Sequence, residues 1–281
     1  MTAPSPTSTP APLIVFTDLD GTLLDTRTYS AEPARAALDR LAARGVPVVF
    51  CSSKSAAEQR PIRRELGLEH TPFIVENGAA VFVPESAGLP VADWPLASGA
   101  AGERVHALGQ PFAQVKAGIR RAADRAGIPV TGYAELTVRQ IAEVTGLDEA
   151  AAARAQRRDF SETLVDQLPP ETWAVFEAAL APEGLCARHG GRFRTVTGAE
   201  TDKGRAVRLL AALFATAAGR SVVTAGLGDS ANDAGLLAAV DHAFLLPSDK
   251  GGWAPLEVPR MRRLARPGPL GWSDAVNELL G

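Results

Sequence analysis

The stretch LIVFTDLDGTLLD, Leu13–Asp25, places three aspartates at the end of a run of apolar residues. A continuous apolar run without alternation is typical of a strand in a parallel sheet that is covered on both faces. Ligands bind beyond the carboxyl ends of such strands, so we expect Asp18 and Asp20 at a binding site. Two carboxylates this close repel each other, and a divalent cation is the simplest way to offset that repulsion. The alternative is that these aspartates, with Asp25, only form a turn and cap a helix.

Composition restricts the possible functions. The chain has 281 residues, 46% of them apolar, and a formal net charge of -3, without the concentrated basic face that nucleic-acid binding needs. No apolar run approaches the roughly 18 to 20 residues that cross a bilayer, and residues 1–12 lack the features of a signal peptide. We therefore expect a cytoplasmic globular protein that binds neither nucleic acid nor a membrane. Its two cysteines, Cys51 and Cys186, are too few for a disulfide framework, and we expect both to be buried.

The order of apolar and helical patterns predicts an α/β fold. Residues 1–12 are rich in Pro, Ser, Thr and Ala and are expected to form a disordered tail. Strand-like runs then alternate with helical patterns through residue 88, and the alternation returns from residue 195 to the end. Helices are expected over 31–43, 56–66, 203–217 and 231–239, with a final helix ending at 280. This alternation predicts a doubly wound parallel sheet of the Rossmann-like type.

Residues 89–194 interrupt that alternation. Helical patterns at 111–126, 147–158 and 170–180 are mixed with short segments such as FSETLV and GLCARHG. Such a mixture is typical of an α+β unit. We therefore expect residues 13–88 and 195–281 to fold together as a core, with residues 89–194 inserted as a second domain.

A second acidic segment, GLGDSANDAGLL at Gly226–Leu237, follows another predicted strand. Its Asp229 and Asp233 should lie at the same sheet edge as the first acidic group, with Asn232 beside them. Converging oxygen ligands of this kind suit Mg²⁺. The same residues also fit G-x-G-x-x-A, the dinucleotide fingerprint, although an aspartate in that turn would face the pyrophosphate without a counter-charge.

The segment DLDGTLLD resembles the first motif of the haloacid dehalogenase-like phosphohydrolases. Ser52 in VVFCSSKS, Lys203 in TDKGRAV and the GDSAND segment resemble the other motifs of that family, in the same order. An insertion after the third predicted strand resembles the Cof-type members, which carry a C2 cap. Read alone, Ser52 could instead cap a helix, and Lys203 could be a surface residue.

The resemblance implies a role for each of these residues in phosphate-ester hydrolysis. Asp18 would be the nucleophile that forms an aspartyl-phosphate, and Asp20 would be the general acid and base. Ser52 and Lys203 would bind the phosphoryl oxygens. The residues expected around Mg²⁺, with Asp20 contributing its backbone carbonyl, are Asp18, Asp20, Asp229 and Asp233.

Within the Cof type, RRDFSETLV and HGGRFRTVTG resemble the mannosyl-3-phosphoglycerate phosphatases. This resemblance implies hydrolysis of mannosyl-3-phosphoglycerate, a small phosphorylated sugar glycerate, to mannosylglycerate and phosphate. The alternatives are a phosphatase for glucosyl-3-phosphoglycerate or another sugar phosphate, and a phosphomutase or phosphotransferase. The expected cap residues for substrate binding are Arg158, Ser161, Glu162, His189, Gly190, Gly191 and Arg192.

Overall fold

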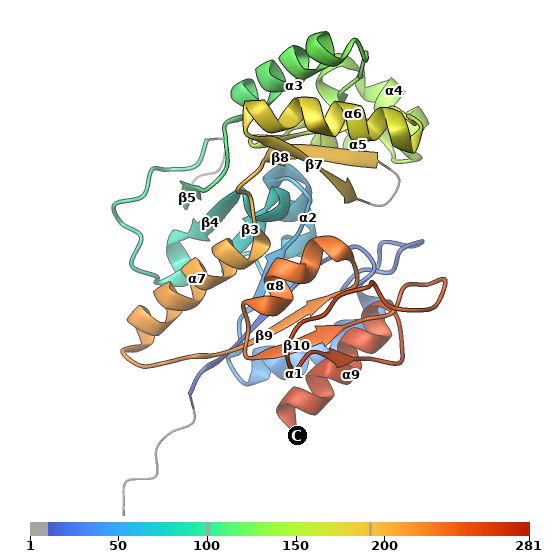
Figure 1. Ribbon diagram of the computed structural model, residues 1–281. Coiled ribbons are helices and arrows are strands. Elements are labelled where there is room, and N and C mark those ends of the chain that lie inside the picture. Colours follow the sequence, from blue (N-terminus) through green and yellow to red (C-terminus); the bar gives the residue numbers. More distant parts are fainter. Residues whose placement is uncertain (1–10, 99–101, 191–192) are drawn as a thin grey trace, which may run out of the picture.

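The computed structural model describes residues 11–98, 102–190 and 193–281, and it contains two sheets (Figure 1). An eight-stranded sheet has the order β11-β10-β9-β1-β2-β3-β4-β5, and a three-stranded sheet has the order β6-β8-β7. Most of the expected N-terminal tail, residues 1–10, lies outside the described residues. In the described parts of the chain, no helix combines the length and the apolar character needed to cross a membrane.

Strand β1 (Leu13–Thr17) lies inside the large sheet, parallel to β9 (Val223–Gly228) on one side and to β2 (Val48–Cys51) on the other. Its side chains alternate between two apolar clusters, one that includes Val15 and one that includes Ile14 and Phe16. Both faces of β1 are therefore covered, which is why its apolar run shows no alternation.

Helices cover both faces of the large sheet (Figure 1). Helices α1 (Arg35–Ala43) and α9 (Gly268–Leu280) supply Leu41 and Trp272 to the first cluster, and α2 (Ala56–Glu65) packs there too. Helices α7 (Lys203–Ala218) and α8 (Ala234–Ala238) cover the opposite face. The predicted doubly wound core is confirmed, and β10 (His242–Leu245) and β11 (Arg262–Arg263) extend it at one edge.

The other edge of the large sheet differs from the prediction. After β3 (Phe73–Val75), strands β4 (Ala80–Pro84) and β5 (Glu103–Ala107) run antiparallel to their neighbours. The core therefore extends to Ala107, and the expected boundary after residue 88 is wrong. Strand β5 reads ERVHA and is mostly half-buried, so no apolar run identifies it in the sequence.

The inserted part of the chain forms the predicted α+β unit, here called the cap. Its sheet consists of β6 (Ser161–Leu164), β7 (Leu185–Gly190) and β8 (Phe193–Gly198), and the central β8 runs antiparallel to both neighbours. Because β8 belongs to this sheet, the expected boundary at residue 194 is also wrong, and the cap continues to Gly198.

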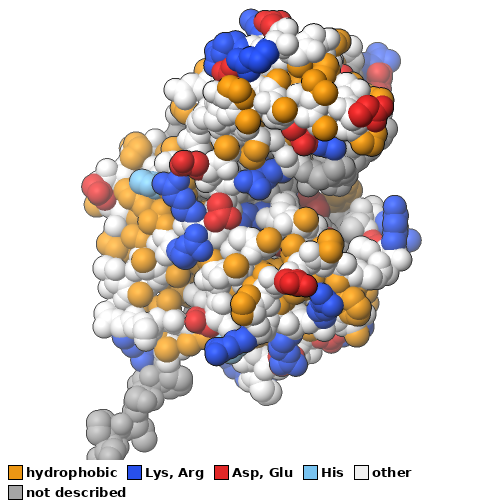
Figure 2. All heavy atoms as spheres, in the orientation of Figure 1, with side chains coloured by type: hydrophobic (Ala, Val, Ile, Leu, Met, Phe, Trp, Pro, Cys, Tyr) orange, Lys and Arg blue, Asp and Glu red, His pale blue; other side chains and the backbone are white. Residues whose placement is uncertain are grey.

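The helices of the cap form two groups. Helices α3 (Phe112–Ala126) and α6 (Pro170–Leu180) pack with the cap sheet around one apolar cluster. Helices α4 (Val138–Thr145) and α5 (Glu149–Gln156) contribute to a smaller one. The surface is hollowed between cap and core on the right of Figure 2.

Candidate active site

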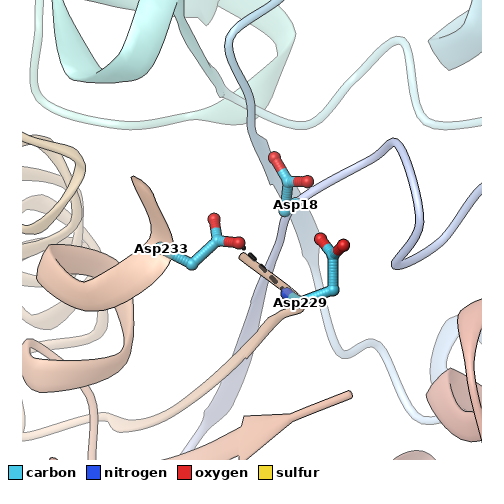
Figure 3. A group of neighbouring side chains, drawn as sticks. All are labelled: Asp18, Asp229 and Asp233. Carbon is cyan, nitrogen blue, oxygen red and sulfur yellow. Dashed lines mark hydrogen bonds between the residues drawn. The ribbon is translucent and has the colours of Figure 1, made fainter. Parts of the chain in front are cut away.

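Three carboxylates meet at the carboxyl ends of β1 and β9. Asp18 follows β1, Asp229 follows β9, and Asp233 ends the short helix η6 (Ala231–Asp233). One oxygen from each carboxylate lies within 4.8 Å of the others (Figure 3). The convergence follows from topology, because β1 and β9 are parallel neighbours and their ends share one sheet edge.

Lys203 joins two of these acids. It is the first residue of α7, and its Nζ lies 2.7 Å from Asp18 Oδ1 and 2.6 Å from Asp233 Oδ1. Burial by itself lowers the pKa of Lys203, but the Asp18 and Asp233 carboxylates outweigh burial and raise it. Lys203 is therefore a buried, charged residue, and the surface alternative for it is wrong.

Holding these carboxylates close together in a buried place costs free energy. Burial raises the pKa of Asp18 well above its ordinary value, and repulsion from Asp233 and Asp229 adds to this while Lys203 opposes it. Burial, with repulsion from Asp233, also raises the pKa of Asp229 to about 7. Asp18 and Asp229 are therefore disfavoured as anions until more positive charge arrives.

The turn after β9 is organised by Asp233. Its Oδ2 accepts hydrogen bonds from the backbone N–H groups of Asp229 and Ser230, both at 3.1 Å. A Cβ atom added to Gly228 would lie 2.5 Å from the Asp233 Cβ, so the glycine permits this contact. Because a protein carboxylate occupies the amides that would cradle a pyrophosphate, the dinucleotide interpretation is wrong.

Asp20 lies outside the group of three acids. Its Oδ2 is 2.9 Å from Lys54 Nζ, and its side chain is 40% exposed. Its other carboxylate oxygen, Oδ1, is buried and has no hydrogen-bond partner in the described parts of the chain. Asp20 thus keeps one carboxyl oxygen without a partner among the described residues, while the other is bound to Lys54.

Ser52 follows β2, the strand next to β1, and only 1% of it is exposed. It does not cap the following helix, because Ser55 fills that position by accepting a hydrogen bond from Glu58 N. The helix-cap alternative for Ser52 is therefore wrong. Its hydroxyl Oγ instead accepts a hydrogen bond from Lys54 N at 3.3 Å, which orders a short loop, Ser52–Lys54, beside Asp18.

Glu76 and Asn77, which follow β3, were not identified from the sequence. Both have positive φ angles, 50° and 62°, a conformation that costs roughly 1 to 2 kcal/mol for a residue with a side chain. Asn77 Oδ1 accepts a hydrogen bond of 3.2 Å from Asn232 Nδ2, in the acidic turn. The available sequence signal was ENG directly after an apolar run, since Asn and Gly adopt left-handed conformations more readily than most residues.

Two of the expected cap residues face the core. Arg158 Nη2 donates to the Ser53 carbonyl at 2.6 Å, and its Nε donates to Ser161 Oγ. Ser161 Oγ in turn donates to Glu76 Oε2. Both side chains are thus hydrogen-bonded to other residues of the protein. Contact with substrate stays a prediction for both.

The other five expected cap residues lie in three places. Glu162 is 3% exposed and accepts hydrogen bonds from the backbone N–H groups of Ala134 and Thr163. His189 and Gly190 lie on β7, where they pair with Arg194 and Phe193 of β8. The remaining two, Gly191 and Arg192, lie outside the described residues. A substrate role for all five stays a prediction.

Known proteins that are similar to this chain include hydrolases and phosphatases. The family described as haloacid dehalogenase-like hydrolase matches residues 15–111. A glucosyl-3-phosphoglycerate/mannosyl-3-phosphoglycerate phosphatase of Methanococcoides burtonii is 34% identical over 270 residues, 95% of this chain and 97% of that protein. A protein of the same description from Persephonella marina is 34% identical over 278 residues, with the same coverage.

A solved structure supports the fold. A phosphatase of the haloalkanoate (HAD) enzyme superfamily from Bacteroides thetaiotaomicron superposes with a TM-score of 0.64 at 19% identity, covering 100% of this chain and 98% of that one. Fold and relatives together define an enzyme of the phosphoric monoester hydrolase class. The chain belongs to the haloacid dehalogenase-like hydrolases.

Proposed function

We propose that this enzyme removes phosphate from glycosyl-3-phosphoglycerates, with mannosyl-3-phosphoglycerate as the first candidate and its glucosyl counterpart as the second. The observation that carries the proposal is the group of Asp18, Asp229 and Asp233 with Lys203, in which only Asp229 is partly exposed, at the edge where a parallel sheet binds ligands. The descriptions of the two relatives support the substrate class. The products would be the glycosylglycerate and inorganic phosphate, in the cytoplasm.

Asp18 is the proposed nucleophile. Lys203 holds its Oδ1 at 2.7 Å, which fixes the carboxylate so that Oδ2 can attack phosphorus. The bond between phosphorus and the glycerate oxygen breaks, an aspartyl-phosphate forms, and one difficult step becomes two easier ones. Ser52 and Lys203 would hydrogen-bond the phosphoryl oxygens and balance their charge.

Asp20 is the proposed general acid and base. Its carboxyl group lies two residues beyond the nucleophile and is partly exposed, so it can reach the oxygen that leaves. In the first step it would give that oxygen a proton, and in the second it would take a proton from the water that attacks the aspartyl-phosphate. Asp20 is then protonated again, as it was before the first step, and orthophosphate leaves.

The donor set fits Mg²⁺, since oxygens of Asp18, Asp229 and Asp233 converge within 4.8 Å of one another, and carboxylate oxygens are the ligands that this ion prefers. Asp18 and Asp229 would hold the ion through their carboxylates, with the Asp20 backbone carbonyl as a further ligand and Asp233 close by. When bound, Mg²⁺ would neutralise charge on the phosphoryl group and on the acids.

A phosphate-release screen tests the proposal. Purified enzyme is assayed with mannosyl-3-phosphoglycerate, glucosyl-3-phosphoglycerate, 3-phosphoglycerate and hexose phosphates, each with and without Mg²⁺. We expect kcat/KM for the glycosyl compounds to exceed that for the others at least tenfold. Equal or better turnover of 3-phosphoglycerate or a simple hexose phosphate would contradict the substrate assignment. Label from the substrate that appears in a second sugar, with no free phosphate, would identify a phosphotransferase instead.

A further inference from the structure

The carbonyl groups of the Ser52–Lys54 loop are all bound by hydrogen-bond donors. The Ser52 carbonyl accepts from Asn77 N at 3.0 Å, and the Lys54 carbonyl accepts from Glu76 N at 3.1 Å. The carbonyl between them, on Ser53, accepts from the guanidinium of Arg158 at 2.6 Å. Two of these donors belong to the core, and the third, Arg158, belongs to the cap.

Glu76 makes a reciprocal connection from the core into the cap. Its carboxylate is fully buried. Oε1 accepts from Asp159 N at 2.9 Å, and Oε2 accepts from Phe160 N at 3.0 Å and from Ser161 Oγ. All three donors are consecutive cap residues.

Arg158 adds charge to this arrangement. Its Nε lies 3.9 Å from Glu76 Oε2, its Nη1 lies 3.6 Å from Glu58 Oε2, and its side chain is 6% exposed. Burial raises the pKa of Glu76, against the opposing effect of Arg158 and the hydrogen bonds from Ser161, Asp159 and Phe160. The buried carboxylate therefore depends on cap residues for its stabilisation.

We propose that Glu76 and Arg158 form a latch that couples the position of the cap to the Ser52–Lys54 loop, which would bind phosphate. Both are therefore positioning residues. The inference rests on the proposed function, because it takes Ser52 as a phosphate ligand. When the cap is seated, Arg158 holds the Ser53 carbonyl. When the cap leaves, Ser53 loses this donor and Glu76 loses all three of its cap donors.

The coupling changes how well the Ser52–Lys54 loop binds phosphate. A carbonyl oxygen that turns toward the phosphoryl group repels it, whereas a carbonyl bound to a guanidinium is held in place and its negative end is balanced. The loop then binds phosphate well only under a seated cap. Substrate affinity thereby depends on whether the cap covers the substrate.

Glu76→Gln tests the latch, because an amide has one acceptor oxygen and must present an N–H donor to part of the Asp159–Ser161 segment. The matched control is Glu183→Gln, since the Glu183 carboxylate binds Arg121 and Arg125 entirely within the cap. Two properties are measured in the presence of Mg²⁺. They are hydrogen exchange of segments 52–54 and 158–162 by mass spectrometry, and the Kd of inorganic phosphate by calorimetry.

We expect Glu76→Gln to accelerate exchange in both segments and to raise the phosphate Kd at least fivefold, while Glu183→Gln matches the wild type. Faster exchange confined to 158–162 with an unchanged phosphate Kd would overturn the coupling, as would an equal effect of the control. If Glu76→Gln does not fold, Arg158→Lys replaces it, because one ammonium cannot reach both Ser53 and Ser161. Neither measurement uses a sugar substrate, so a failed substrate screen leaves this test intact.

Discussion

Lys203 Nζ donates a hydrogen bond of 2.7 Å to Asp18 Oδ1, and the two side chains are only 0% and 8% exposed. The contact joins the start of α7 to the end of β1. A buried lysine in this position keeps the Asp18 carboxylate oriented and offsets its charge. The pair therefore supports both the proposed chemistry and the stability of the site, and these two roles can be tested separately.

Replacing Asp18 with Asn should abolish turnover and leave the fold intact. The amide is a poor nucleophile, and loss of a nucleophile lowers kcat by at least about a thousandfold. Activity is measured by phosphate release and the fold by circular dichroism. Asp25→Asn is the control, because the Asp25 side chain accepts hydrogen bonds from Arg27 and Thr28 in an exposed turn. More than about 1% residual activity in purified Asp18→Asn would remove Asp18 as the nucleophile.

Replacing Lys203 with Met should destabilise the metal-free protein. Asp18 and Asp233 would then remain buried without their cation, and breaking a buried pair costs about 3 to 5 kcal/mol. Urea unfolding measures the loss. A second substitution, Asp233→Asn, removes one of the unpaired charges and should restore part of it. A change in unfolding free energy of under about 1 kcal/mol in the single variant would show that the pair is not stabilising.

Asp229→Asn should weaken the binding of Mg²⁺ without removing the nucleophile. Loss of one carboxylate from the group of three acids should raise the Mg²⁺ concentration for half-maximal activity by roughly tenfold or more. The control is Asp39→Asn, on the exposed face of α1. If a chelator leaves wild-type activity unchanged, or if both variants share one Mg²⁺ requirement, the metal does not bind where we propose.

Stability of the metal-free protein should fall as pH rises from about 5 to 8. The pKa of Asp229 is raised to about 7 and that of Asp18 is also raised, both from an ordinary value of 3.8. A carboxyl group with a higher pKa in the folded state favours folding while it is protonated, and that contribution is lost as pH passes the folded pKa. Thermal unfolding across this range should show a shallower fall for Asp229→Asn and with Mg²⁺. Rising stability over the same range would contradict the raised pKa values.

Much of the core followed from local sequence. The run Leu13–Thr17 is apolar because both faces of β1 are covered, and Asp18 and Asp229 meet because their strands are parallel neighbours. These are consequences of periodicity and strand order, so they can be predicted without coordinates. The position of Lys203 at a helix start was predicted in the same way.

The connections between cap and core could not be predicted in this way. The bond from Arg158 to Ser53 was not expected, although Arg158 was a candidate for substrate binding, and Glu76 was not identified at all. Both contacts join segments far apart in the chain, and local patterns carry no information on such pairing. Strand β5 was missed for a related reason, since its half-polar sequence belongs to a sheet only through pairing with β4.

The most direct test of the central claim is a crystal structure obtained with Mg²⁺ and beryllium fluoride, which mimics a phosphoryl group on a carboxylate. We expect beryllium bonded to Asp18, fluorine atoms within hydrogen-bond distance of Ser52 and Lys203, and Mg²⁺ ligated by Asp18 and Asp229. Beryllium bonded to another residue, or Mg²⁺ in a site that lacks Asp18 and Asp229, would contradict it.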